Sequence, residues 1–81
     1  MKERIRRIVN HHARLSCNLQ PADDAVDLYR AGMTSHASVA LMLALELEFD
    51  LEFPDSMLSR SVFESVDSIT NAIENLQQVK Q

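Results

Sequence analysis

Ser35 is the side chain best placed for covalent chemistry, because it lies where a polar segment gives way to the most apolar run of the chain. The adjacent His36 does not make Ser35 a hydrolytic nucleophile, since neighbouring helical residues point about 100° apart. The glycine-flanked turn that presents such a nucleophile is also missing. A helix start nevertheless offers free N–H groups and a positive dipole end, which suit a phosphate. Ser35 is predicted to cap a helix, with Thr34 as the alternative cap, and a phosphoester would fit there.

The histidines and the cysteine do not suggest a second reactive centre. His11 and His12 are adjacent, so they cannot both face one metal ion from one side of a helix. No further histidine or cysteine follows at ligand spacing, and we therefore predict no metal site. Cys17 is the single thiol, which excludes an internal disulfide, and it is interpreted as a small core residue.

Hydrophobic periodicity predicts the elements that position Ser35. A first helix over roughly residues 2–16 is indicated by apolar residues at helical spacing, with His12 on the same face. The segment from 18 to 32 contains Pro21 and two adjacent aspartates, and it predicts a long loop. The residues expected to anchor these two segments in the core are Ile5, Ile8, Val9, Leu15, Leu19, Val26 and Leu28.

Three further helices are expected after this loop. The second should run from about Ser35 to Phe49, and Asp55 or Ser56 should cap a short third helix that extends through Leu58 and Arg60. A last helix should begin after Ser65 and bury Ile69, Ala72, Ile73, Leu76 and Val79. The predicted fold class is all-α: a four-helix bundle with a long first loop and a short third helix, forming a single domain over residues 1–81.

The second helix carries apolar residues on two faces. One stripe has the spacing of a core: Ser38, Leu41, Met42, Leu45 and Phe49. A second stripe with the same spacing consists of His36, Val39, Ala40, Leu43 and Leu47. So small a domain has few elements to cover both, so we expect Val39 and Leu43 to stay exposed as an interaction surface. The alternative is that the third helix or the long loop covers them.

Charge divides the chain into two parts. Residues 1–14 carry five basic side chains and one acidic, whereas residues 15–81 carry three basic and eleven acidic. The acidic body should repel nucleic acid and attract basic protein surfaces. The alternative, a nucleic-acid arm formed by Arg4, Arg6, Arg7 and Arg14, is less favoured than a solvated helix face. No apolar stretch long enough for a membrane span occurs, and we expect a cytoplasmic protein.

Three stretches of the sequence resemble the acyl carrier protein family. They are Asp27-Leu28-Tyr29-Arg30-Ala31-Gly32-Met33-Thr34-Ser35 and, after three residues, Val39-Ala40-Leu41-Met42-Leu43-Ala44-Leu45-Glu46-Leu47-Glu48-Phe49-Asp50, followed by Phe53-Pro54-Asp55. The resemblance covers nearly the whole chain and is most specific between Asp27 and Asp55.

This resemblance implies a carrier protein that is not itself an enzyme. A phosphopantetheinyl transferase would attach a phosphopantetheine arm to Ser35 through a phosphodiester. The thiol of that arm would hold an acyl or aminoacyl group as a thioester. The implied partners are an acyl- or amino acid:carrier-protein ligase and a downstream transferase or synthase, with the carrier as a monomer. The implied partner-binding residues are Thr34, His36, Val39, Ala40, Leu43, Glu46 and Leu47, and Glu48 would also meet basic partner residues.

Departures from the family pattern narrow the expected cargo. The family usually reads Asp-Ser-Leu where this chain has Thr34-Ser35-His36, and Ala37, Ala40 and Leu47 replace acidic residues. Docking should therefore depend less on charge. The chain looks more like the small stand-alone carriers charged by amino acid:carrier-protein ligases. Two alternatives remain open: a carrier for fatty-acid or polyketide synthesis, and an unmodified helical adaptor that binds partners through Val39 and Leu43.

Overall fold

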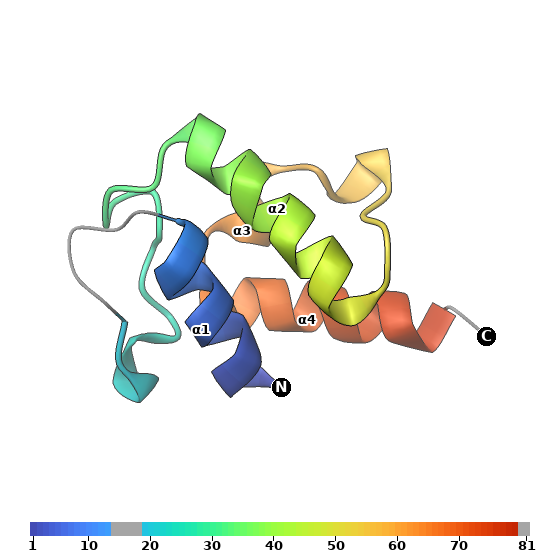
Figure 1. Ribbon diagram of the computed structural model, residues 1–81, viewed down its shortest axis with the longest axis horizontal. Helices are drawn as coiled ribbons and strands as arrows, with labels where there is room; N and C mark the ends of the chain where they lie inside the picture. Colours follow the sequence, from blue (N-terminus) through green and yellow to red (C-terminus); the bar gives the residue numbers. More distant parts are fainter. Residues whose placement is uncertain (14–18, 80–81) are drawn as a thin grey trace.

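The computed structural model describes residues 1–13 and 19–79, and over these ranges the chain forms four α-helices joined by loops and short 3₁₀ turns (Figure 1). The helices are α1 (Lys2–His12), α2 (Ser35–Phe49), α3 (Arg60–Phe63) and α4 (Val66–Val79). The 3₁₀ turns are η1 (Pro21–Asp23) and η2 (Asp55–Met57). The predicted all-α fold, with a long first loop and a short third helix, is confirmed.

The core forms where α1, α2 and α4 meet, because α1 packs against both other helices (Figure 1). Each long helix contributes fully buried branched side chains, and α3 packs on α4. The largest fully buried side chains are Ile5, Val9, Leu41, Leu45, Val66, Ile69 and Ile73 of these helices and Leu28 of the loop before α2. Burial of each contributes about 1.5–3 kcal/mol to the free energy of unfolding, which matters in so short a chain.

The α1 helix buries Ile5 and Val9, which are four residues apart and share one face. In the described residues it ends at His12, and Ala13 is its C-cap. The predicted extension to residue 16 lies outside the described residues, as do Arg14, Leu15 and Cys17. Asn10 connects α1 to the loop: its Oδ1 accepts the Leu19 N–H at 2.7 Å, and its Nδ2 donates to the Leu19 carbonyl at 3.2 Å.

Two of the three predicted loop anchors are confirmed, and one is wrong. Leu19 and Leu28 are buried. Val26 is 38% exposed, because it lies at the end of a surface turn. The Val26 N–H closes this turn by donating to the Asp23 carbonyl at 3.0 Å. Leu28 also donates its N–H to the Glu64 carbonyl at 2.6 Å, between α3 and α4. The loop is therefore fixed to the end of the molecule that leads into α4.

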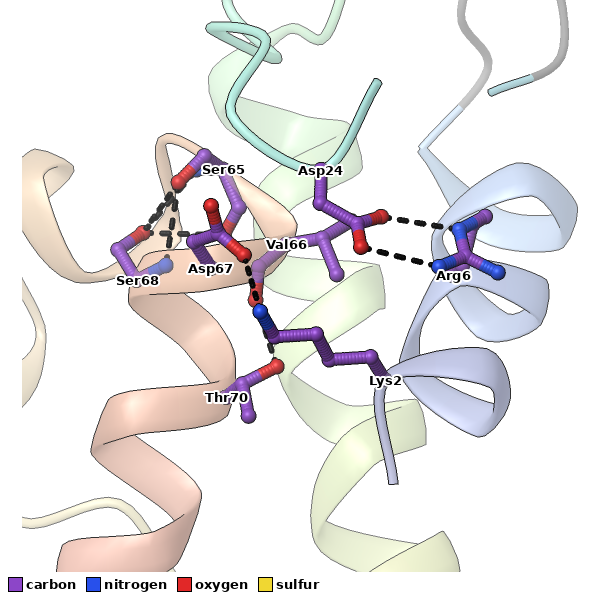
Figure 2. A network of polar contacts seen from close by, with 8 residues as sticks. All are labelled: Lys2, Arg6, Asp24, Ser65, Val66, Asp67, Ser68 and Thr70. Atoms are coloured by element: carbon purple, nitrogen blue, oxygen red, sulfur yellow. Dashed lines mark hydrogen bonds and ion pairs between the residues drawn. The ribbon is translucent and has the colours of Figure 1, made fainter. Parts of the chain in front are cut away.

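A network of charged groups holds the same loop against α1 and α4 (Figure 2). Arg6 Nε and its terminal nitrogen donate to the two oxygens of Asp24 at 2.9 and 3.0 Å, and both side chains are largely buried. Lys2 Nζ lies 2.8 Å from Asp67 Oδ1. The Asp67 N–H donates to the Asp24 carbonyl at 3.0 Å. The hydrogen bond from Arg6 lowers the pKa of Asp24, and the bond to Asp67 raises the pKa of Lys2.

The segment between α2 and α4 differs in detail from the prediction. The expected short helix through Leu58 is split: η2 ends at Met57, Leu58 leaves the helical region at φ −88° and ψ 63°, and α3 begins at Arg60 after an extended Ser59. At the next helix, Ser65 is confirmed as a cap, because its Oγ accepts the Ser68 N–H at 3.1 Å while Ser68 Oγ accepts the Ser65 N–H at 3.1 Å.

The face predicted for α4 is confirmed where it is described. Ile69, Ala72 and Ile73 are buried, and Leu76 packs against the core. The Val79 side chain lies outside the described part of the chain. Within the described part of the chain, no helix has both the length and the apolar composition needed to cross a membrane.

Candidate functional site

Ser35 is the first residue of α2, and the turn before it holds it in place. The Met33 N–H donates to the Leu28 carbonyl at 3.0 Å, and both side chains are buried. The Gly32 N–H donates to the Tyr29 carbonyl at 3.2 Å, with Gly32 at φ 117°. A Cβ atom would clash in that conformation, so glycine is required there. The start of α2 is thus fixed by buried residues on either side of a tight turn.

Thr34, and not Ser35, is the N-cap of α2. The Thr34 Oγ1 accepts the Ala37 N–H at 3.0 Å, and the Thr34 backbone is extended at φ −85° and ψ 166°. The preferred prediction that Ser35 itself caps the helix is therefore wrong, and the alternative is confirmed. The reason is tertiary: burial of Met33 and Ala37 sets where the first helical turn begins.

This capping arrangement leaves the Ser35 hydroxyl available. Ser35 is exposed, and within residues 1–13 and 19–79 its hydroxyl makes no hydrogen bond. The nearby Ser38 is different, because its Oγ donates to the Ser35 carbonyl at 2.7 Å. Of the two serines in the first turn of α2, Ser35 has its hydroxyl free at the positive end of the helix dipole, where a phosphodiester would be stabilised.

The apolar surface expected beside Ser35 is uncovered. Val39 and Leu43 are each 52% exposed, and Leu47 is 86% exposed. With His36 and Ala40, which are also exposed, these residues form a continuous strip along α2 that we call the α2 face. Neither α3 nor the long loop covers Val39 or Leu43, so the alternative of a fully covered second stripe is wrong. Contiguous exposed apolar strips are typical of interaction surfaces, so the α2 face is a candidate for one.

Ser35 also opens onto a pocket between α2 and the segment that leads into α3. The pocket has a volume of about 370 Å³ and is lined by residues of both. On the α2 side lie Ser35, Ser38, Val39 and Met42, and opposite them lie Leu58, Ser59, Arg60 and Phe63, with Tyr29 of the loop. Tyr29, Leu58 and Arg60 were not predicted from the sequence to belong to a site. Arg60 was visible as one of three basic residues in the acidic part of the chain.

The acidic residues near the end of α2 are engaged inside the domain. Glu46 Oε2 accepts the Phe53 N–H at 2.9 Å, which holds the segment after α2 against the helix. Glu48 Oε2 accepts from a terminal nitrogen of Arg4 at 2.6 Å. Their expected contacts with basic partner residues would therefore compete with internal ones.

The basic start of the chain is likewise largely neutralised. Arg4 pairs with Glu48, Arg6 with Asp24 and Lys2 with Asp67, and all three partners belong to the acidic body. These pairs argue against the nucleic-acid arm, because phosphate contacts would have to replace them. His11 and His12 pack edge to face with ring centroids 4.7 Å apart. Among the residues that the structure describes, no group of three potential metal ligands occurs.

The chain is similar to known carrier proteins. No protein-family model matches the chain. It is 40% identical over 74 residues to an aminoacyl carrier protein from Agrobacterium fabrum, which covers 91% of this chain and 89% of that protein.

Two solved complexes also contain similar chains. The first is the complex of an engineered Bradyrhizobium japonicum glycine:[carrier protein] ligase with a carrier protein from Agrobacterium tumefaciens and AMP. Its matching chain has a TM-score of 0.86 and 40% identity, and the match covers 91% of this chain and 99% of that chain. The Bradyrhizobium japonicum ligase complexed with glycylated carrier protein matches with a TM-score of 0.75 and 25% identity, over 88% and 95%.

Proposed function

This chain belongs to the aminoacyl carrier protein family, and from that premise we propose that it carries an aminoacyl group on a phosphopantetheine arm esterified to Ser35. Carriers of this kind are substrates of their partner enzymes and not enzymes themselves. The main support for the proposal is the difference in hydrogen bonding between the Thr34 and Ser35 side chains. Thr34 takes over the capping bond with Ala37, which leaves the Ser35 hydroxyl free for a transferase to modify.

The residues around Ser35 suit a phosphodiester-linked arm. The exposed hydroxyl lies at the N-terminus of a 15-residue helix, whose dipole favours the negative phosphate. The bound arm would supply a thiol that holds the cargo as a thioester. The protein itself would fix the attachment point and, through the α2 face, present it to a partner at high effective concentration.

A small cargo fits the domain better than a long acyl chain. The core between α1, α2 and α4 is filled by side chains such as Leu41 and Leu45, both fully buried. The pocket beside Ser35 is open and of modest volume, about 370 Å³. Because the similar carriers are found in complexes with glycine:[carrier protein] ligase, in one case glycylated, we propose glycine or a similarly small amino acid as the cargo and such a ligase as the charging partner.

The α2 face, with Thr34 and Glu46 at its edges, is the proposed docking surface for this ligase, for the phosphopantetheinyl transferase and for a downstream transferase. Its exposed side chains are apolar or weakly polar: His36, Val39, Ala40, Leu43 and Leu47. Docking should thus rely on burial of apolar area more than on charge, and it should depend weakly on salt.

Modification of Ser35 is tested by co-expression with a broad-specificity phosphopantetheinyl transferase and measurement of the intact mass. The wild-type chain should gain the mass of one phosphopantetheine, and the Ser35→Ala variant should not. Ser38→Ala is a matched control, because Ser38 lines the same pocket but has its hydroxyl bonded to the Ser35 carbonyl. It should be modified like the wild type. An unmodified wild-type chain, or a modified Ser35→Ala chain, would refute the proposal.

Charging is tested on the modified protein with a glycine:[carrier protein] ligase, ATP and single amino acids. We expect a further mass gain of one glycyl group that is removed by hydroxylamine, as a thioester would be. Charging only with long-chain fatty acids by an acyl ligase would instead support the alternative of a fatty-acid carrier.

The exposure of Val39 and Leu43 also suits a second candidate function, that of an unmodified helical adaptor. An adaptor should bind its partner equally well with Ser35→Ala and lose binding with Val39→Asp. A carrier should lose cargo transfer in both variants.

A further inference from the structure

Like Arg4, which stacks on Phe49, Arg60 places its guanidinium over an aromatic ring, and Arg60 does so beside Ser35. Its guanidinium carbon lies 4.4 Å from the centroid of the Tyr29 ring, so the charged group stacks on an aromatic face. Arg60 and Tyr29 lie 31 positions apart in the sequence, on α3 and on the loop before α2. Both line the pocket onto which Ser35 opens. The stacked arrangement holds a long, flexible side chain in one place beside the modification site.

Most other basic side chains already have acidic partners. Lys2, Arg4, Arg6 and Arg30 each lie within ion-pair distance of a carboxylate. Within residues 1–13 and 19–79, Arg60 makes no ion pair with any carboxylate. Arg7 shares this property, but it belongs to α1 and does not line the Ser35 pocket. An acidic domain thus keeps one positioned guanidinium unpaired beside the serine that is to receive a phosphate.

We propose that Arg60, stacked on Tyr29, binds the phosphodiester of the arm on Ser35 and holds the arm in the pocket between α2 and α3. This inference rests on the proposed modification of Ser35. A guanidinium can donate two parallel hydrogen bonds to phosphate oxygens, which a lysine cannot reproduce. Met42, Leu58 and Phe63 line the same pocket and provide apolar surface for the methyl groups of the arm.

The position of Arg60 gives this contact a reversible character. The Arg60 side chain is exposed, and the pocket is open to solvent, so the arm can leave when a partner enzyme offers it a better site. Leu58, on the pocket rim, is 46% exposed and could contact a partner together with Val39. A partner that displaces Leu58 or Arg60 would free the arm. The arm would therefore be docked in the free carrier and extended in complexes.

The test compares apo and phosphopantetheinylated protein by NMR. In the wild type, the Arg60 Nε–H resonance should shift upon modification. The ³¹P resonance and the arm's methyl resonances should differ from those of free 4′-phosphopantetheine. In Arg60→Gln these resonances should move toward the free values, with the ratio of docked to free arm lowered about tenfold, as for loss of a charge-assisted hydrogen bond. Raising the salt concentration should weaken docking in the wild type more than in the variant.

Four further variants separate the proposed contact between Arg60 and the phosphodiester, which we call the clamp, from general effects of charge and packing. Arg30→Gln removes a neighbouring exposed arginine that pairs with Asp27, and it should leave the arm resonances unchanged. Tyr29→Phe keeps the aromatic face and should retain docking, whereas Tyr29→Leu should reduce it. Arg60→Lys should restore docking only in part. Amide spectra of each apo protein check that the fold is unchanged.

Several results would overturn the proposed contact between Arg60 and the phosphodiester. Modified protein with an Arg60 resonance identical to that of the apo form, or an Arg60→Gln variant with unaltered arm resonances, would overturn the clamp and leave the carrier function intact. Slower modification of Arg60→Gln without any change in the arm resonances would assign Arg60 to recognition by the transferase and would also overturn the clamp. A chain whose mass shows no modification would overturn the proposed function and the clamp together.

Discussion

The network around Asp24 and the surroundings of Ser35 use polar side chains in opposite ways. Around Asp24, the Arg6 side chain donates to the carboxylate (Figure 2), and the Asp67 N–H donates to the Asp24 carbonyl. Around Ser35, the serine hydroxyl and the Arg60 guanidinium have no hydrogen-bonding or ionic partner in the part of the chain that the structure describes. The first region holds the long loop in place, and the second keeps its groups available for a ligand.

This difference shows how a domain of 81 residues can combine rigidity with reactivity. The loop from Leu19 to Met33 has little regular structure, yet it must place Ser35 at the tip of α2. Ion pairs and buried leucines fix the loop against α1 and the start of α4, so the polar groups around Ser35 are not needed for that purpose. Stability and function can then be altered separately by mutation.

The largest expected effect comes from removing a loop anchor. Leu28→Ala deletes a fully buried side chain and should lower the free energy of unfolding by about 2–5 kcal/mol, a large share of the stability of a small domain. Urea denaturation followed by circular dichroism measures the change. Leu47→Ala makes the same chemical change at a position that is 86% exposed, and it should alter stability by less than about 0.5 kcal/mol. Similar losses in both variants would contradict the assignment of Leu28 as an anchor.

The next test changes a residue of the α2 face near Ser35 and leaves the loop anchors unchanged. Val39→Asp should raise the dissociation constant for the charging ligase about tenfold, because a carboxylate must be desolvated on the α2 face. Its unfolding midpoint should stay close to that of the wild type. Val26→Asp places the same charge on another exposed valine, outside the α2 face, and should bind normally. Equal weakening by both variants would indicate a general effect of charge, and the α2 face would lose its proposed role.

Thr34 lies at the boundary between the loop and α2. Thr34→Ala removes the acceptor for the Ala37 N–H and should cost about 1 kcal/mol of stability by loss of the cap. It should also lower the rate of Ser35 modification, since the first turn would fray. Thr34→Ser keeps the oxygen and should restore both properties. Differential scanning calorimetry and a timed modification assay provide the measurements, and an unchanged melting temperature in Thr34→Ala would contradict the capping role.

The smallest expected effect is a pH dependence that arises in the network. Arg6 lowers the pKa of Asp24 below its unfolded value, so the ionised carboxylate stabilises the folded state. This contribution is fully present above the unfolded pKa of about 4 and is lost as the pH falls through the folded value.

Urea midpoints measured between about pH 6 and pH 2 should therefore decline less steeply for Asp24→Asn than for the wild type. The Asn variant should be less stable at neutral pH. Asp55→Asn changes an exposed carboxylate at the start of η2 and should keep the wild-type slope. Parallel curves for wild type and Asp24→Asn would exclude Asp24 as a source of the pH dependence.

The sequence predicted best those features that depend on regular spacing. The limits of α2 follow from its apolar repeat, and they agree with the structure at Ser35 and Phe49. The exposure of Val39 and Leu43 could also be inferred, because two apolar stripes on one helix exceed what so few elements can cover. The resemblance that singled out Ser35 rests on this same region.

Features that depend on tertiary contacts were predicted less well. Thr34 and Ser35 are both good capping residues, and the choice between them depends on which neighbours are buried. Val26 was assigned to the core because valine is apolar, but in an irregular loop no period determines which side chains point inward. The stacking of Arg60 on Tyr29 joins segments with no shared pattern, so it becomes visible only when the chain is folded.

Gly32 limits which substitutions the chain can tolerate in the turn before α2. It is the only glycine in the sequence, and its φ of 117° lies beyond the left-handed helical region that asparagine or aspartate can adopt. In a saturation library, this codon should therefore be among the least permissive in the gene, although its residue has no side chain to offer a ligand. Selection at this site would act on a backbone angle alone.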